Sequence, residues 1–168
     1  MVLEVKGWKL LYHPIFGDHY IALRNEVREL REKLTPAEFA RHPQVKLVAA
    51  IRRAITEIIP DNPNRPDFWL SANLSRFRRV KGYGIPDRYR LYYVFSERAK
   101  TVIVLYLNDS SSLRKQGAKT DPYAIFADLV KSGVIGKNFE ENRRQWEKAR
   151  KRGGRLAQGE ESPKYQAD

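Results

Sequence analysis

The sequence predicts an α+β domain in which a helical hairpin near the N-terminus packs on an antiparallel sheet and further helices follow the sheet. Three observations lead to this prediction. Apolar residues recur at spacings of three and four through the first third of the chain, as on one face of a helix. In the middle of the chain β-branched and aromatic residues alternate with polar ones, as in strands. Helical spacing returns after residue 121.

The hairpin is expected to consist of helices over about residues 15–34 and 36–59. Between them, Thr35-Pro36-Ala37-Glu38 has the pattern of a helix start. Thr35 offers a capping hydroxyl, proline suits the first helical position, and Glu38 can return the capping hydrogen bond. Both helices carry an apolar stripe that can pack on a sheet.

The sheet is expected over about residues 76–107 as three antiparallel strands in a meander. A polar loop follows, and then helices over about 121–132, after Asp121-Pro122, and 139–152, after Asn138. The last helix is rich in Arg and Lys. We expect residues 1–152 to form one domain and residues 153–168 to be a disordered tail.

Charge is the strongest property of the whole chain, since 32 Lys and Arg face 20 Asp and Glu, for a net charge of +12. A polyanion such as RNA is the natural partner. The alternative, that the charge only keeps the protein soluble, is less favoured because the excess is concentrated. The absence of cysteine excludes disulfides and thiolate ligands, and three scattered histidines leave little for a metal, so no cofactor is expected. The chain has no signal peptide or membrane-spanning run, which predicts a cytoplasmic protein.

The charge peaks between residues 76 and 90, where six cations face only Asp87. If Val80 and Leu91 turn toward the helices, strand alternation places Arg79 and Arg90 on the opposite face, where they can hold a phosphodiester. Accessible tyrosines on such a face can stack unpaired bases, worth roughly 1–3 kcal/mol each. The residues expected to bind RNA in this hairpin are Arg76, Tyr83, Arg88 and Tyr92, and those expected to act on the phosphate are Arg79, Lys81 and Arg90.

Cleavage of RNA at this face would need a base for the 2′-hydroxyl proton, cations for the charge on the phosphate, and an acid for the leaving oxygen. The cationic strands contain no His or Glu. Lys81 lies between two arginines whose charges favour its neutral form, so it is the candidate for the base. Arg79 and Arg90 are the candidates for binding the phosphate. A tyrosine or a second lysine would be the acid.

A second polar cluster follows the sheet, and it comprises Arg114, Lys119, Thr120, Asp121 and Tyr123. The simplest function of Asp121 before Pro122 is to cap a helix. The alternative is that the helix N-terminus attracts phosphate and that Tyr123 points into the same groove. We expect His13, before Pro14, to be structural rather than catalytic.

Several motifs, in order along the chain, carry a family resemblance. They are Gly7-Trp8, His13-Pro14, Arg79-Val80-Lys81, Arg88-Tyr89-Arg90-Leu91, Asn108-Asp109 and Gly117-Ala118-Lys119-Thr120-Asp121-Pro122-Tyr123. Over roughly residues 6–145 the chain resembles the YhaV toxins, a RelE-like group of type II toxin–antitoxin systems. The resemblance implies helices on one face of an antiparallel sheet, metal-independent endonucleolytic cleavage of RNA, and neutralisation by an antitoxin.

Position by position, the resemblance implies that Arg79 is the functional arginine, that Lys81 and Arg90 are basic strand positions, and that Lys119, Asp121 and Tyr123 belong to the C-terminal motif. We therefore expect the catalytic residues to be Arg79, Lys81, Arg90, Lys119 and Tyr123, with Arg114 and Asp121 joining the RNA-binding set. The partners expected are RNA and an acidic antitoxin of the swapped-hairpin, DNA-binding type, with the ribosome as a further candidate. Two alternatives stay open: a protein that binds RNA or the ribosome without cutting, and a RelE-like relative that poisons a topoisomerase.

Overall fold

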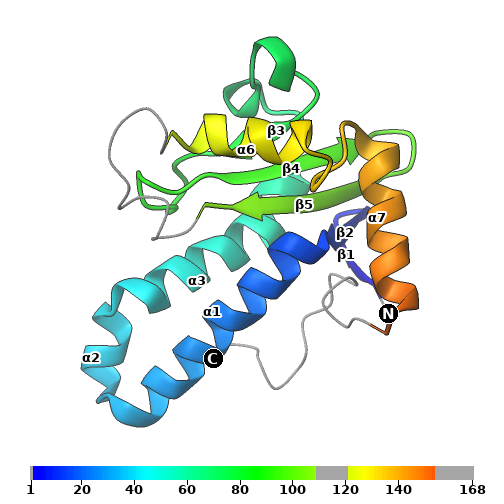
Figure 1. Cartoon of the computed structure of the whole chain (residues 1–168). Helices are drawn as coiled ribbons and strands as arrows, with labels where there is room; N and C mark the ends of the chain where they lie inside the picture. The colour runs from blue at the N-terminus through cyan, green and yellow to red at the C-terminus, as the bar shows by residue number, and fades with distance from the viewer. Residues whose placement is uncertain (1, 109–120, 154–168) are drawn as a thin grey trace.

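The computed structural model describes residues 2–108 and 121–153 (Figure 1). The predicted tail from residue 154 and most of the loop before Asp121, including Arg114 and Lys119, lie outside the described residues. A five-stranded sheet forms the centre, in the order β1-β2-β5-β4-β3. The strands are β1 (Leu3–Val5), β2 (Trp8–Tyr12), β3 (Arg78–Val80), β4 (Leu91–Ser96) and β5 (Thr101–Leu107). The predicted antiparallel meander corresponds to β3, β4 and β5.

Two strands precede the first helix, so the prediction that the fold starts with a helical hairpin is wrong. β1 and β2 are antiparallel and are joined at Lys6 and Gly7, which both have positive φ. β2 then pairs in parallel with β5, so the sheet is mixed rather than antiparallel. Consecutive residues Leu10, Leu11 and Tyr12 are all buried. A strand covered on both faces has no polar alternation, and that is why its sequence did not reveal it.

The helical hairpin itself follows β2. Helix α1 (Pro14–Lys33) ends shortly before Thr35, which caps α2 (Pro36–Arg41). Both hydrogen bonds of the predicted capping box form there. The single helix predicted over 36–59 is wrong, because α3 (Pro43–Arg53) starts anew after His42. Pro43 lacks an N–H and disfavours helical backbone before it, and His42 is extended, at φ −67° and ψ 130°. Beyond α3 the chain continues through a π-helical turn (Ala54–Ile58) into α4 (Ile59–Asp61).

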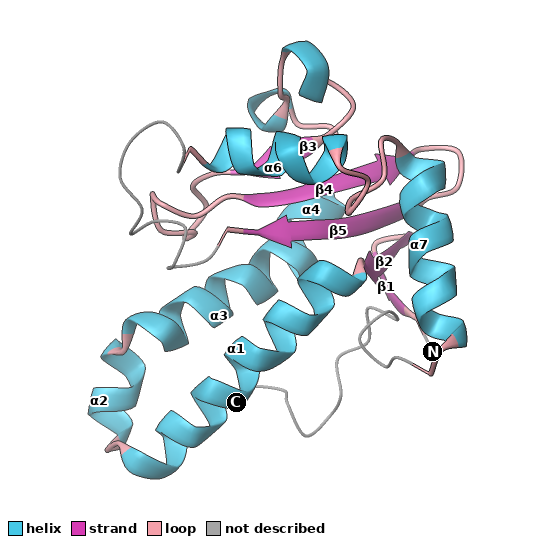
Figure 2. Cartoon of the chain, viewed as in Figure 1, coloured by secondary structure: helices cyan, strands magenta, loops and turns pink. Residues whose placement is uncertain are grey.

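Helices cover both faces of the sheet, whereas the resemblance implied one. On one face, α1 and α3 pack through residues such as Phe16 and Ile51 onto Tyr93. On the other face lie α6 (Pro122–Lys131) and α7 (Phe139–Lys151), which contribute Phe126 and Trp146. Figure 2 shows these layers, with α1 and α3 below the strands and α6 above them. Two short 3₁₀ turns, Pro66–Phe68 and Ala72–Leu74, come before β3.

In the part of the chain that the structure describes, no helix is both long enough and apolar enough to cross a membrane.

Candidate active site

The hydroxyl group of Tyr123 is the point at which two distant parts of the chain meet. Arg79 on β3 donates a hydrogen bond from Nε to this oxygen at 2.9 Å, and Arg90, directly before β4, donates a second one at 3.1 Å. Both guanidinium groups also lie over the Tyr123 ring, at 5.8 and 5.9 Å from its centroid. Tyr123, from the cluster at the start of α6, therefore meets the cationic hairpin at one place.

Strand register explains why the two arginines face α6. Arg79 pairs with Tyr92 and Val80 pairs with Leu91, so alternate residues point to opposite faces. Val80 and Leu91 join the core under α1 and α3, which leaves Arg79 on the α6 face, as the alternation predicted.

Backbone carbonyl groups hold both guanidinium groups in place. Arg79 donates from Nη1 to the carbonyl of Asp67 at 2.8 Å. Arg90 donates from Nη1 to the carbonyl of Tyr89 at 2.9 Å and to that of Asp87. Among the described residues, the Nη2 atom of each arginine has no hydrogen-bond acceptor. These two donors remain available for a ligand's oxygen atoms.

Asn108 fixes the segment that carries Arg90. This side chain is fully buried at the end of β5. Its Oδ1 accepts from the backbone N–H of Arg90 at 2.6 Å, and its Nδ2 donates to the carbonyl of Arg88 at 2.8 Å. The sequence marked Asn108 only as part of a motif, and its positioning function was missed because the two partners lie 18 and 20 residues away.

Tyr123 is positioned by the start of α6. Asp121 caps this helix, since its Oδ1 accepts from the backbone N–H of Tyr123 at 3.0 Å, which confirms the capping prediction. The Tyr123 ring meets the Tyr92 ring edge to face, with centroids 6.2 Å apart. Tyr92 in turn stacks on Phe126 at 4.1 Å. The phenol thus rests on packed aromatic rings.

The two arginines lower the pKa of Tyr123. Partial burial by itself raises the pKa of this phenol, but the hydrogen bonds from Arg79 and Arg90, together with their charges, outweigh it and bring the pKa below the ordinary value of 10.0. Burial instead raises the pKa of the neighbouring Tyr92. Because the Tyr123 oxygen accepts two N–H bonds, its own O–H is left to donate. The site therefore holds a proton that can be given up more readily than from a free phenol.

Tyr92 is not accessible, so the expectation that it stacks bases is wrong. Its exposed fraction is 0%, because α6 covers this face of the sheet. Tyr83 is accessible as expected, with 37% of its surface exposed. The Tyr83 hydroxyl donates to the carboxylate of Asp67 at 3.1 Å. The backbone carbonyl of the same residue, Asp67, accepts the hydrogen bond from Arg79.

Three further predicted cations, Arg76, Lys81 and Arg88, are exposed around the same hairpin, and Lys81 follows the last residue of β3. They add exposed positive charge to the two segments that carry Arg79 and Arg90. Within the described residues, no group of three His, Asp or Glu side chains is placed to hold a metal ion.

His13 lies elsewhere and is structural, as expected. Its Nδ1 accepts from the backbone N–H of Ile15 at 3.2 Å, which caps α1, and its Nε2 is 2.6 Å from Oε1 of Gln145 on α7. Burial lowers the pKa of His13, although the bond with Gln145 acts in the opposite direction. The imidazole joins two helices rather than entering the site.

Two convergent guanidinium groups and a phenol of lowered pKa are the kinds of group that bind a phosphodiester and transfer a proton to it. Such a cluster is typical of proteins that bind and act on nucleic acid. Residues 10–147 match the family model Toxin_YhaV, described as a toxin with endonuclease activity, of a toxin–antitoxin system.

Two relatives agree with this match. The Ribonuclease toxin YhaV of Escherichia coli (strain K12) is 37% identical over 150 residues, covering 86% of this chain and 95% of that protein. The Toxin YhaV of Escherichia coli O6:H1 is 38% identical over 136 residues, covering 77% and 86%. No solved structure matches the chain. The chain belongs to the YhaV toxin family, and its partner in such a system is an antitoxin.

Proposed function

We propose that this toxin is an endoribonuclease that cuts RNA without a metal ion, by attack of a 2′-hydroxyl on the adjacent phosphate. The observation that supports this most is the convergence of Arg79 and Arg90 on the hydroxyl of Tyr123. A relative named as a ribonuclease toxin, 37% identical, points to the same substrate. RNA supplies its own nucleophile, so the protein needs to bind the phosphate, move two protons and stabilise charge.

In the proposed step, the 2′-oxygen forms a bond to phosphorus while the bond from phosphorus to the 5′-oxygen breaks. Lys81 takes the proton from the 2′-hydroxyl, and Tyr123 gives its proton to the leaving 5′-oxygen. Arg79 and Arg90 hold the non-bridging oxygens through their free Nη2 donors and stabilise the added negative charge. Lys119, outside the described residues, is the second candidate for the acid.

The surrounding residues are proposed to bind the flanking nucleotides. Arg76 and Arg88 are exposed cations that can pair with neighbouring phosphates, and exposed Tyr83 can stack a base. Arg114 and the carboxylate of Asp121 complete the proposed RNA-binding set.

Several finer features belong to the same proposal. They are a RelE-like fold with one domain over residues 1–152, action in the cytoplasm where messenger RNA is translated, and an acidic, swapped-hairpin antitoxin. The ribosome is proposed as a site at which messenger RNA is presented to the toxin.

Purified protein incubated with RNA in the presence of EDTA tests the proposal. We expect cleavage that leaves 5′-hydroxyl ends, and we expect Arg79→Ala and Lys81→Ala to lose it while RNA affinity changes by only a few fold. Intact RNA in the parent reaction, or cutting by both variants at the parent rate, would contradict the mechanism. Tight RNA binding without any cutting by the parent would favour the non-catalytic binding protein.

A further inference from the structure

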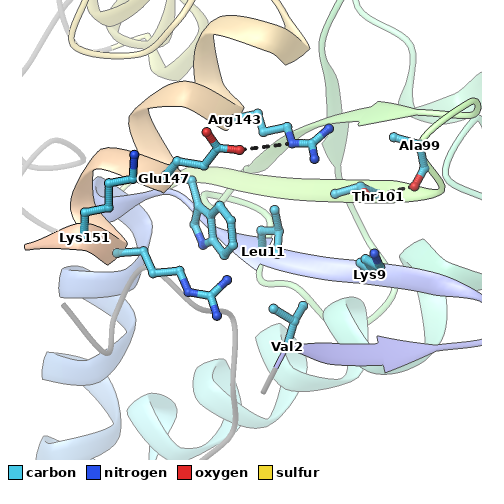
Figure 3. Close-up of a pocket in the computed structure, with 10 residues that line it drawn as sticks. Val2, Lys9, Leu11, Ala99, Thr101, Arg143, Glu147 and Lys151 are labelled. Atoms are coloured by element: carbon cyan, nitrogen blue, oxygen red, sulfur yellow. Dashed lines mark hydrogen bonds and ion pairs between the residues drawn. The ribbon is translucent and has the colours of Figure 1, made fainter. Parts of the chain in front are cut away.

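A second cationic site lies between α7 and the strands (Figure 3), and Tyr123 is not among the residues that line it. It is a cavity of about 610 Å³. Thr101, which lines it, begins β5, whereas Tyr106, which stacks with Tyr92 beside the active site, lies near the end of that strand. The two are five positions apart along the strand, about 17 Å at the usual rise per residue. We call this cavity the α7 pocket.

The α7 pocket combines an apolar floor with a cationic rim. Leu11 and Trp146 are buried in its lining, and Val2 and Ala99 add apolar surface. The lining also includes four cations, Lys9, Arg143, Arg150 and Lys151, all of which are exposed. Among the lining residues that the structure describes, one carboxylate opposes them, that of Glu147, and it pairs with Arg143 at 3.5 Å. An apolar side chain flanked by carboxylates is the ligand that complements this surface.

Trp146 argues against RNA as the ligand. Stacking of a base needs an accessible aromatic face. Only 6% of the Trp146 surface is exposed, and the guanidinium group of Arg150 lies over its ring at 5.2 Å from the centroid. An apolar floor with a polar rim is instead the usual anatomy of a protein–protein anchor site.

We propose that the α7 pocket binds an acidic segment of the antitoxin, which inserts an apolar side chain onto Leu11 and Trp146 and places carboxylates on Lys9, Arg150 and Lys151. The proposal rests on the proposed function only for the identity of the partner. Because the pocket shares no residue with the Arg79–Arg90–Tyr123 cluster, recognition of the antitoxin and cleavage of RNA are separable by mutation.

Charge reversal on the rim tests this separation. The variant Lys9→Glu/Arg150→Glu changes two exposed side chains. Its matched control, Arg41→Glu/Lys46→Glu, makes the same change in charge at exposed positions on α2 and α3. The probe is the purified product of the open reading frame next to this gene, together with short overlapping peptides of its sequence. We expect the rim variant to bind this protein and one acidic peptide at least about tenfold more weakly, or 1.4 kcal/mol, while the control binds like the parent.

Filling the cavity provides a second test that leaves the charge unchanged. Ala99 lines the pocket, so Ala99→Leu should occupy part of the space and weaken binding of the same peptide. Thermal unfolding of each variant checks that the fold is kept. Cleavage of RNA with EDTA should equal that of the parent in all three variants, since none touches the active site.

Normal antitoxin binding by the rim variant or by Ala99→Leu would overturn the proposal. Equal loss in the control would also overturn it, because overall charge rather than the pocket would then decide binding. If the rim variant loses RNA affinity and keeps the antitoxin, the pocket is an RNA site instead. If the parent leaves RNA intact, the proposed function fails, and the binding comparison still decides this inference.

Discussion

The two cationic sites at opposite ends of β5 use the same residue types in different ways. In the active site, Arg79 and Arg90 are fixed by backbone carbonyls and by one phenol oxygen. In the α7 pocket, Lys9 and Lys151 are exposed above an apolar floor. Fixed donors stabilise charge that develops at one place, because they need no reorganisation during the reaction. Exposed flexible cations suit the recognition of a polar segment. The groups that hold each cation, rather than the presence of the cation, distinguish the two proposed functions.

Arg90→Ala should have the largest effect. It removes one fixed donor to the phosphate, so we expect the single-turnover cleavage rate to fall by about 10²–10³-fold. Arg98→Ala removes an exposed arginine from the turn between β4 and β5, at the other end of the sheet, and should cut like the parent. Similar rates for the two variants would mean that the active-site arginines act only through overall charge.

Asn108→Ala should have an intermediate effect by releasing the backbone at Arg88 and Arg90. We expect a cleavage rate reduced by about tenfold, and a loss of about 1–3 kcal/mol in the free energy of unfolding from unpaired buried groups. If Asn108 acts by positioning Arg90, the double variant with Arg90→Ala should cut no more slowly than Arg90→Ala alone. If the rate losses of the two single variants instead multiply in the double variant, Asn108 acts only on the fold and does not position Arg90.

His13→Asn, away from both sites, should have the smallest effect and no influence on cleavage. Burial lowers the pKa of His13 in the folded protein, so its stabilising contribution is present above the unfolded value of 6.5 and is lost as pH falls below it. Asparagine keeps a capping acceptor for α1 and removes this titration. Urea unfolding at pH values on either side of 6.5 should show that the free energy of unfolding falls less in the variant than in the parent when the pH is lowered. His42→Asn, the same change at the cap of α3, is the control for the substitution itself.

Local signals predicted the parts of the fold that depend on neighbouring residues. The capping box at Thr35 and Glu38 and the cap at Asp121 form as the sequence indicated. β2 was not predicted, since its parallel partner β5 lies about 90 residues further along and its own residues do not alternate. The break at His42 was missed because the apolar stripe used to predict the helix continues beyond Pro43, and the effect of this proline on the helix before it was not considered.

Strand alternation predicted which face Arg79 occupies, but it does not reveal what covers that face. A second helical layer lies there, so Tyr92 is buried under α6 instead of facing RNA. The convergence of Arg79 and Arg90 on Tyr123 spans 44 and 33 residues, and no local pattern encodes such a contact. At the level of sequence, the two clusters were linked only by the family resemblance and by the alternative that Tyr123 points into the same groove.

The pH dependence of single-turnover RNA cleavage, measured with EDTA for the parent and for Tyr123→Phe, tests the central claim most directly. A phenol that donates a proton must be protonated, so the parent rate should fall as pH rises through a pKa below 10.0. Tyr123→Phe should cut much more slowly and lose that fall, while its affinity for RNA is kept. A variant that cuts at the parent rate, or that shows the same fall at high pH, would contradict the assignment of Tyr123 as the acid.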